Sequence, residues 1–548
     1  MTKEEKRSRK WRLYNGKRVK RPNRLVFALV TLLLVLVLAV SAVAGAFRSY
    51  FGVVDNIVFT KAPTGAEVEA VTEEAKAITL EEAREGIVLL TNKEECLPLA
   101  KETKVNVFGR GSVYGTFGGT GSGAGGTNYV NLYDGLKTAG FSLNEDLVAF
   151  YEANAKAAVS MGLVGTDFGL YENPASDISE ELLASAKEYS DVAIYVISRV
   201  GGEGDDLPMD TAAYYGGEAG RHYLELNAAE ESMLHLLEEN FGTLVVVLNS
   251  TNAMELGFLE DEGVDAALWS ECYGSMGTVA LGEILCGEVN PSGRTSDTFA
   301  YEVESNPTYY SFGGYDYTNA SYANAGMMAG TGDAISGQDP YHYVKYNEGI
   351  YVGYRFYETA AADGFIDYEK TVQFPFGYGL SYTSFTQTLD EVSFDGVAVT
   401  ATVTVKNEGE AAGKDVVELY YSAPYIKGGI EKSEVVLGDF AKTSLLAPGE
   451  SETVTCTIQA EDMASYDYTG IKAEGGAYVL EAGEYAIRLQ SDSHHVISEK
   501  SIQVEKDVIY NDDNDGKRPG DQITAVNHFD DVSYGEEITY LSRADWEG

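Results

Sequence analysis

Residues 179–197 read SEELLASAKEYSDVAIYVI, and this stretch decides the fold class. Ser179 suits the N-cap of a helix that the pattern predicts to run to about Tyr189. An apolar run at 192–197 follows at once and predicts a buried strand. A helix that leads directly into an apolar strand is typical of a mostly parallel sheet with helices on both faces.

The same order recurs along the chain. A predicted helix at 228–240 precedes the apolar run LVVVL at 244–248, and further strands are predicted at 105–108 and 266–269. Near the start, Thr79 and Glu82 fit a capping box that would open a helix with Ile87, Leu89 and Leu90 on its apolar face. Residues 70–384 are therefore predicted to form an α/β sandwich domain, with a long surface loop at 305–345.

After about residue 385 the hydrophobic period changes to two. Alternating strands are predicted at 397–405, 416–421, 451–458 and 483–489, separated by turns rich in Gly, Pro and Asn. Short strands at this density predict an all-β, immunoglobulin-like sandwich over residues 385–505. Residues 506–548 are polar and predict a linker tail.

The N-terminus predicts a membrane anchor. Residues 1–24 form a basic tail with eleven Lys and Arg, and residues 25–47 carry no charge. Those 23 residues would span about 34 Å as a helix, enough for a bilayer core of about 30 Å. We therefore expect a single-pass transmembrane helix in the cell membrane, with a cytoplasmic N-terminus and an extracellular body. A cleaved signal peptide, with Ala42-Val43-Ala44 as its site, is the alternative, but the apolar stretch is long for one.

The charge distribution excludes nucleic acid as a partner. The formal net charge is −45, and because the basic tail contributes +9 (eleven Lys and Arg against Glu4 and Glu5), the remainder carries −54. Such a body repels polyanions. The aromatic share of 11% and hydrophobic share of 44% exclude a disordered chain.

Cysteine and histidine spacing gives no sign of a metal site. The four cysteines, Cys96, Cys272, Cys286 and Cys456, form no CxxC pair, and the six histidines form no HExxH motif. At most one disulfide could form, for example Cys272 with Cys286, and buried free thiols are favoured. We expect no metal and no cofactor.

Residues 197–208, ISRVGGEGDDLP, form the segment most suited to chemistry. They follow a predicted parallel strand, and open α/β sheets bind ligands beyond the carboxyl ends of their strands. Asp205 and Asp206 would disfavour another negative charge nearby, which would raise the pKa of Glu203 and suit it to act as a general acid. From spacing alone, however, a solvated acidic turn is the favoured interpretation.

Several motifs, taken together and in order, resemble glycoside hydrolase family 3 outside its (β/α)8 barrel. They are GIVLLTN at 86–92 with LPL at 97–99, SRVGGEGD at 198–205, GEVNPSGR at 287–294, YNEGIYVGYRFY at 346–357, FPFGYGLSY at 374–382, and LYYSAP, FAKT and LAPGE within 419–450. The resemblance covers residues 70–505. It implies the family's C-terminal-type α/β sandwich domain at 70–384 and a fibronectin type III-like domain at 385–505.

The resemblance also implies a function. It identifies Glu203 as the general acid/base of a β-glucosidase-like enzyme that hydrolyses O-glycosidic bonds in oligosaccharides or β-glycosides. Arg199 and Asp205 become expected substrate-binding residues, with a structural role for Arg199 left open. The family often has an aromatic residue and then Asp-Arg after its Glu-Gly, whereas Asp205 and Asp206 follow directly here, which changes the charges around the glutamate.

A retaining glycosidase needs a second carboxylate as nucleophile, which the family carries on a barrel strand in a Ser-Asp-Trp context. Ala544-Asp545-Trp546 follows no hydrophobic strand, so we interpret it as linker. The chain resembles permuted members in which the barrel comes last, and we expect a truncated product, inactive alone, in which the barrel is missing.

Two further interpretations stay open. The chain could instead be a non-catalytic carbohydrate-binding or structural module, with Tyr-rich loops that stack on sugar rings. The run Gly121-x-Gly123-x-x-Gly126 superficially fits a dinucleotide fingerprint but lies too far beyond its strand, so a sugar-site loop or a plain turn is favoured.

Overall fold

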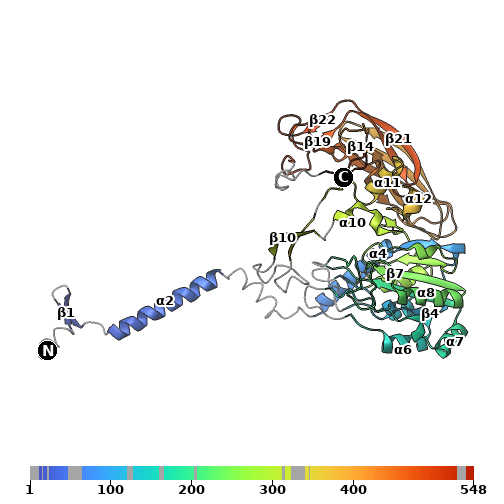
Figure 1. Ribbon diagram of the computed structural model, residues 1–548, viewed down its shortest axis with the longest axis horizontal. Coiled ribbons are helices and arrows are strands. Elements are labelled where there is room, and N and C mark those ends of the chain that lie inside the picture. The colour runs from blue at the N-terminus through green and yellow to red at the C-terminus, as the bar shows by residue number, and fades with distance from the viewer. Residues whose placement is uncertain are drawn as a thin grey trace. The chain divides into compact units, whose positions relative to one another are not determined.

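The computed structural model describes residues 11–14, 17–20, 24–46, 65–119, 128–158, 166–202, 206–311, 315–321, 340–344, 346–526 and 539–547. The chain divides into two compact units, Met1–Glu74 and Ala75–Gly548. The first unit holds the antiparallel strands β1 (Trp11–Tyr14) and β2 (Lys17–Lys20) and the helix α2 (Arg24–Ala46) (Figure 1).

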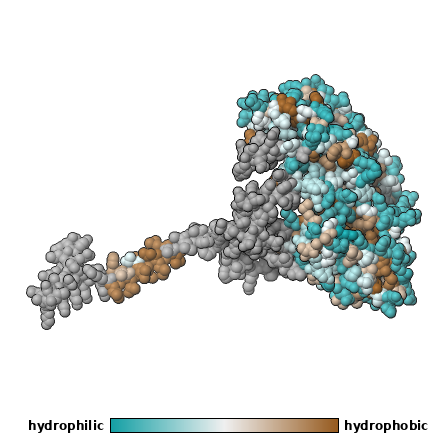
Figure 2. All heavy atoms as spheres, viewed as in Figure 1, coloured by the Kyte–Doolittle hydropathy of each residue, from teal (hydrophilic) through white to brown (hydrophobic). Residues whose placement is uncertain are grey.

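The prediction of a transmembrane helix is wrong by this structure. A helix does form over the expected stretch, and its described side chains are mostly hydrophobic and exposed (Figure 2). Among the described residues, however, no helix is long and apolar enough to cross a membrane.

In the second unit, a six-stranded sheet with strand order β3-β8-β7-β6-β4-β5 forms the α/β domain. The strands are β3 (Val88–Asn92), β4 (Lys104–Phe108), β5 (Ser142–Leu143), β6 (Val192–Arg199), β7 (Thr243–Ser250) and β8 (Ala266–Trp269). Among these six strands, β3 and β8 pair antiparallel and all other neighbours pair parallel. The prediction of a mostly parallel sheet is therefore confirmed.

Helices cover both faces of this sheet (Figure 1). They are α4 (Ala66–Gly86), α5 (Leu132–Thr138), α6 (Glu145–Asn154), α7 (Glu180–Tyr189), α8 (Ala228–Asn240) and α9 (Gly277–Leu285). Strand β6 shows why two cores form. Ala193, Tyr195 and Ile197 point into one hydrophobic cluster, and Ile194 and Val196 point into the other. Alternation along a strand thus gives each face its own apolar layer.

The predicted capping box at Thr79 is wrong. Helix α4 begins earlier, at Ala66, and the Thr79 hydroxyl donates to the carbonyl of Lys76 within the helix. The apolar residues that follow belong to β3, which pairs with β8. A short apolar run fits a strand as well as a helix face, and here pairing with a neighbouring strand decides the outcome.

The all-β region forms the predicted sandwich of two sheets. One sheet has the order β13-β14-β17 and the other β16-β15-β20-β21. Their bounds are β13 (Phe385–Phe394), β14 (Ala398–Asn407), β15 (Val416–Ser422), β16 (Val436–Lys442), β17 (Ser451–Gln459), β20 (Gly483–Gln490) and β21 (Val496–Val504). Alternate residues of both sheets, such as Val403 and Ile487, meet in one core.

Smaller elements complete the unit. The strands are β9 (Phe299–Ala300), β10 (Tyr315–Ser321), β11 (Pro340–Tyr343), β12 (Val372–Phe374), β18 (Ser465–Asp467), β19 (Ala477–Leu480) and β22 (Val508–Tyr510). The helices are α10 (Pro307–Ser311), α11 (Tyr354–Ala362) and α12 (Tyr368–Thr371). Strand β22 pairs with β19, so the stretch predicted as a linker tail begins with ordered sheet.

Candidate active site

The segment predicted to carry the chemistry starts at the carboxyl end of β6, in the interior of the sheet. Glu203 and Asp205 themselves lie outside the described residues, so their expected roles stay predictions. The structure does describe both flanks of the loop, at residues 200–202 and from Asp206 onward. These flanks give the positions of the two ends of the segment.

A buried asparagine joins the strand ends beneath this loop. Asn249, at the end of β7, accepts from the Ser198 hydroxyl at 3.0 Å, and its amide donates to the carbonyl of Thr116 at 3.0 Å. The same amide group contacts the carbonyl of Glu271, which follows β8. One side chain thus links the ends of β6 and β7 to the segments that follow β4 and β8. Since Asn249 is fully buried, these bonds make a rigid base for the loop.

Two glycines bring the glycine-rich run against the loop. A Cβ at Gly119 would lie 2.8 Å from the carbonyl oxygen of Gly201. A Cβ at Gly201 would lie 2.9 Å from the Thr251 hydroxyl. The contact of Gly119 is with backbone and is too close for a side chain, so this position requires glycine, whereas Gly201 meets the side chain of Thr251. The first residues of the glycine-rich run therefore pack on the base of the predicted catalytic loop.

Arg199 is 1% exposed and makes a bidentate ion pair with Glu230 of α8, at 2.6 and 2.7 Å. Its remaining donors reach the carbonyls of Tyr223 and Glu225, at 2.8 and 2.7 Å. These bonds place Arg199 as a support that holds the end of β6 against α8. A contact between Arg199 and substrate stays a prediction.

A polar cavity of about 400 Å³ opens beside the start of the loop, and Arg199 and Val200 lie in its wall. Glu172, which is also in the wall, is buried and accepts hydrogen bonds from the backbone N–H groups of Arg110 and Asn173, both at 2.9 Å. Burial raises the pKa of Glu172 to about 8 despite these bonds. Sequence reasoning missed this residue because no strand or glycine motif marks it.

A larger cavity, of about 640 Å³, lies on the other flank of the loop and begins at Asp206. Its wall is mainly apolar and includes Met209, Met254 and Val352. Tyr223 lines both cavities.

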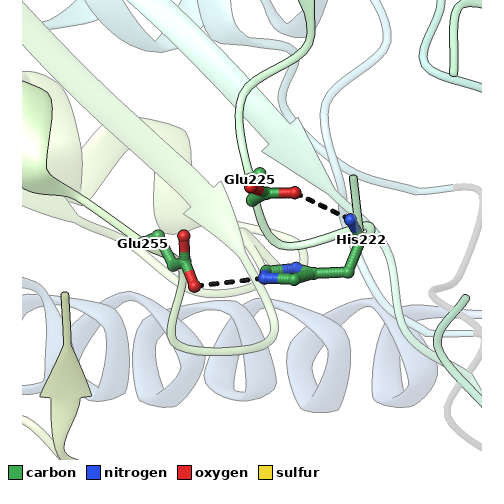
Figure 3. A group of neighbouring side chains, drawn as sticks. All are labelled: His222, Glu225 and Glu255. Atoms are coloured by element: carbon green, nitrogen blue, oxygen red, sulfur yellow. Dashed lines mark hydrogen bonds and ion pairs between the residues drawn. The ribbon is translucent and has the colours of Figure 1, made fainter. Parts of the chain in front are cut away.

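His222, which lines the larger cavity, lies beside Glu225 and Glu255, and the three residues resemble a metal-ligand set (Figure 3). The ring Nδ1 of His222 accepts the backbone N–H of Leu224 at 3.2 Å, which leaves the proton of a neutral ring on Nε2. That Nε2 lies 3.1 Å from Glu255 Oε1 and donates to it. In this tautomer the trio is a hydrogen-bonded support.

All four cysteines are free, including Cys272 and Cys286.

The segment around Asp545 is docked on the domain. The Trp546 ring stacks on Phe365 with centroids 5.2 Å apart. Arg543 forms ion pairs with Asp363 and Glu434, at 3.0 and 2.9 Å. The last described residues therefore pack against α11 and the sandwich rather than extend as a free linker.

Comparison with known proteins gives a family for each half of the second unit. The sequence model of the glycosyl hydrolase family 3 C-terminal domain matches residues 87–354, and that of the fibronectin type III-like domain matches residues 415–493. Both agree with the resemblance carried by the motifs.

Similar full-length proteins are β-glucosidases. The chain is 37% identical over 456 residues to β-glucosidase A of Butyrivibrio fibrisolvens, a match that covers 77% of this chain and 50% of that protein. It is 35% identical over 414 residues to a β-glucosidase of Ruminococcus albus, covering 74% of this chain and 38% of that one. The chain thus spans half the length, or less, of these curated relatives.

Solved structures agree. A β-glucosidase of Paenibacillus barengoltzii superimposes with a TM-score of 0.65 at 29% identity, covering 79% of this chain and 44% of that chain. β-Glucosidase 3B of Thermotoga neapolitana, solved with glucose, gives a TM-score of 0.64 at 29% identity, covering 80% of this chain and 55% of that one. With its α/β sandwich and fibronectin type III-like domains matched in order, the chain belongs to glycoside hydrolase family 3.

Proposed function

We propose that this chain supplies the acid/base half of a β-glucosidase active site, with Glu203 as the general acid/base. The observation that supports the proposal is where the described flanks of its loop lie: Val200, directly after the interior strand β6, lines one cavity, and Asp206 lines another. The relatives named above are β-glucosidases, which favours a β-glucoside as the substrate class.

In the proposed reaction Glu203 first donates its proton to the glycosidic oxygen, and the bond from that oxygen to the anomeric carbon breaks. A second carboxylate, the nucleophile, holds the sugar as a glycosyl-enzyme ester. Glu203 then takes a proton from water, whose oxygen attacks the anomeric carbon and releases the sugar. A retaining site requires the two carboxyl groups to lie about 5–5.5 Å apart.

Asp205 and Arg199 have supporting parts in this proposal. A carboxylate at Asp205, two residues from Glu203, would raise the pKa of the glutamate and keep it protonated as the acid. Asp205 would also accept hydrogen bonds from sugar hydroxyls. Arg199 would act on substrate through the loop that it anchors, since Glu230 already occupies its guanidinium.

The test is turnover of a chromogenic β-glucoside by the chain, alone and together with a family 3 barrel domain. We expect Glu203→Gln to lower turnover of a poor leaving group by about 100- to 10,000-fold, as for loss of a general acid/base. Azide should restore part of the rate with an activated aryl glucoside, because azide needs no base to attack the glycosyl-enzyme. Glu262→Gln, at an exposed position between β7 and β8, is the matched control. Equal rates for both variants would refute the role of Glu203.

The second candidate is a carbohydrate-binding module without activity. Partly exposed tyrosines in and beside the polar cavity, Tyr114 and Tyr129 among them, favour it, because aromatic faces pack on sugar rings. Saccharide binding that persists in Glu203→Gln, with no turnover in either assay, would support the module.

A location of the body outside the cytoplasm, expected from the basic N-terminal tail, stays a proposal. Protease treatment of intact cells would test it. An accessible body would be cleaved without lysis, and a protected body would refute the location.

A further inference from the structure

Residues 541–547 form a compact loop with a shape of its own. The backbone N–H of Trp546 donates to the carbonyl of Ser542 at 2.7 Å, and the N–H of Ser542 donates to the carbonyl of Glu547 at 3.3 Å. The Ser542 hydroxyl also accepts the N–H of Ala544 at 3.1 Å. The loop belongs to no helix or strand, so its place on the domain does not depend on a shared sheet. A loop closed by its own bonds loses little conformational freedom when it binds a surface.

The surface under this loop offers carboxylates to Arg543. The guanidinium donates to both oxygens of Asp363 at 3.0 Å and to Glu434 at 2.9 Å. It also lies 4.6 Å from the ring centroid of Tyr425. The side chain of Arg543 is only 8% exposed. An arginine fork binds a carboxylate through two bonds at once, which a lysine cannot do, so these contacts select arginine.

An aromatic cluster receives Trp546. Its ring centroid lies 5.2 Å from that of Phe365, 5.3 Å from Tyr351 and 5.9 Å from Phe356. Tyr351 and Phe356 belong to a buried core of the domain. Among the described residues, the buried indole N–H of Trp546 has no hydrogen-bond partner. Recognition of this side chain therefore rests on ring packing.

Glu431 holds the backbone of the loop. Its Oε1 accepts the Ser542 hydroxyl at 2.7 Å, and its Oε2 accepts the N–H of Arg543 at 3.1 Å. The Tyr351 hydroxyl donates to the same carboxylate, which joins this contact to the aromatic cluster. With Asp363 and Glu434, three carboxylates face the loop, and such a surface favours a cationic ligand.

We propose that this docking surface is a peptide-recognition site whose ligand is the 541–547 loop of the same chain. Its ligand class is a turn-forming peptide with an arginine three residues before a tryptophan. Arginine is selected by the bidentate contact to Asp363, and tryptophan by the aromatic cluster. Because the contacts are made by side chains on a loop with its own shape, the free peptide binds the same surface when the loop is released. The inference does not depend on the proposed function.

The test uses the full chain with Arg543→Ala and Trp546→Ala, in which the docking surface is unchanged but the chain's own loop no longer fits it. The probe is a fluorescently labelled peptide of residues 539–548, and binding is measured by anisotropy. We expect saturable binding to this variant and at least about tenfold weaker binding to the wild-type chain, whose own loop competes as a tethered ligand.

Two changes in the peptide separate the contacts. Arg543→Lys in the peptide should weaken binding about tenfold, since a lysine cannot bridge both oxygens of Asp363. Trp546→Phe should weaken binding less than Trp546→Ala does, because the docking surface contacts the ring and not the indole N–H.

Two changes in the chain provide the control. Asp363→Asn, added to the variant with the released loop, should weaken peptide binding about tenfold. Glu152→Gln, at an exposed position of α6, should leave binding unchanged. Urea unfolding checks that each variant folds, and the single variant Arg543→Lys replaces the double variant if that one does not.

Absence of saturable binding to a folded variant, or equal binding of the Arg543→Lys peptide, would overturn the inference. Sedimentation of the wild-type chain adds a second outcome. A dimer that free peptide dissociates would place the loop on the docking surface of a second copy, and would overturn the assignment within one chain. A monomer that shows the expected peptide preferences would support it.

Discussion

Replacing Glu230 by alanine would leave the charge of Arg199 buried and unpaired. The side chains of the two residues are 1% and 5% exposed, and their two bonds measure 2.6 and 2.7 Å. Glu230 also accepts the N–H of Asn227 at 2.9 Å in the capping box that begins α8. Removal of one partner of a buried ion pair costs about 3–5 kcal/mol, so we expect the free energy of unfolding of the α/β domain to fall by about that much.

The neighbouring residue gives a matched control. Glu231 pairs with Arg221 at 2.6 Å, but both side chains are partly exposed, at 47% and 33%. An exposed pair contributes about 0–1 kcal/mol, so Glu231→Ala should have little effect. Urea unfolding followed by fluorescence measures both variants, because Trp269 lies in the core of the same sheet. The double variant Arg199→Met with Glu230→Met should be less destabilised than Glu230→Ala, since no unpaired charge remains. If Glu230→Ala and Glu231→Ala shift the urea midpoint equally, the reasoning is refuted.

Two further predictions concern the pH dependence of stability and the glycine contact. Burial raises the pKa of both Glu172 and Glu418 to about 8, so the folded state holds protons that the unfolded chain has already lost above about pH 4.5. Their contribution is complete at low pH and is lost as the pH rises toward 8, by at most about 1.4 kcal/mol per pH unit for each group. Glu172→Gln should flatten the decline measured by urea unfolding between about pH 5 and 8, and an unchanged slope would contradict this assignment. Gly119→Ala should cost about 1–3 kcal/mol through its 2.8 Å approach to the Gly201 carbonyl. Gly86→Ala, where no atom lies within 4 Å of the added Cβ, should be nearly neutral in the same assay.

Local patterns sufficed to predict the layers of the fold. Strand β6 and the strands of the sandwich could be predicted because successive side chains of a strand point to opposite faces of its sheet. Ile194 and Tyr195, for example, lie in different hydrophobic clusters. The edge strand β3 could not be predicted, since its partner β8 lies far along the chain. The membrane span was predicted from length and composition alone, and among the described residues no helix is long and apolar enough to form it.

The candidate site could be predicted only in part, because some of its contacts join segments that are far apart in the sequence. The place of the Glu203 loop follows from the strand before it, whereas the contacts that hold the loop come from distant segments. Asn249 reaches Thr116, and Tyr223 reaches Val200, across intervals that no local pattern marks. Glu172 enters the polar cavity in the same way, from a stretch with no strand. Such contacts depend on the packed sheet.

Stability and catalysis share residues at the end of β6. Arg199 is the last residue of that strand, and its guanidinium binds Glu230 and the carbonyl of Tyr223. Tyr223 in turn holds both ends of the loop that carries Glu203. A general acid must stay within hydrogen-bond reach of the glycosidic oxygen, and a displacement of about 1 Å can lower the rate about a hundredfold. The buried ion pair therefore does more than tie α8 to the sheet, because Arg199 directly precedes the proposed catalytic loop and also binds Tyr223, which holds the ends of that loop.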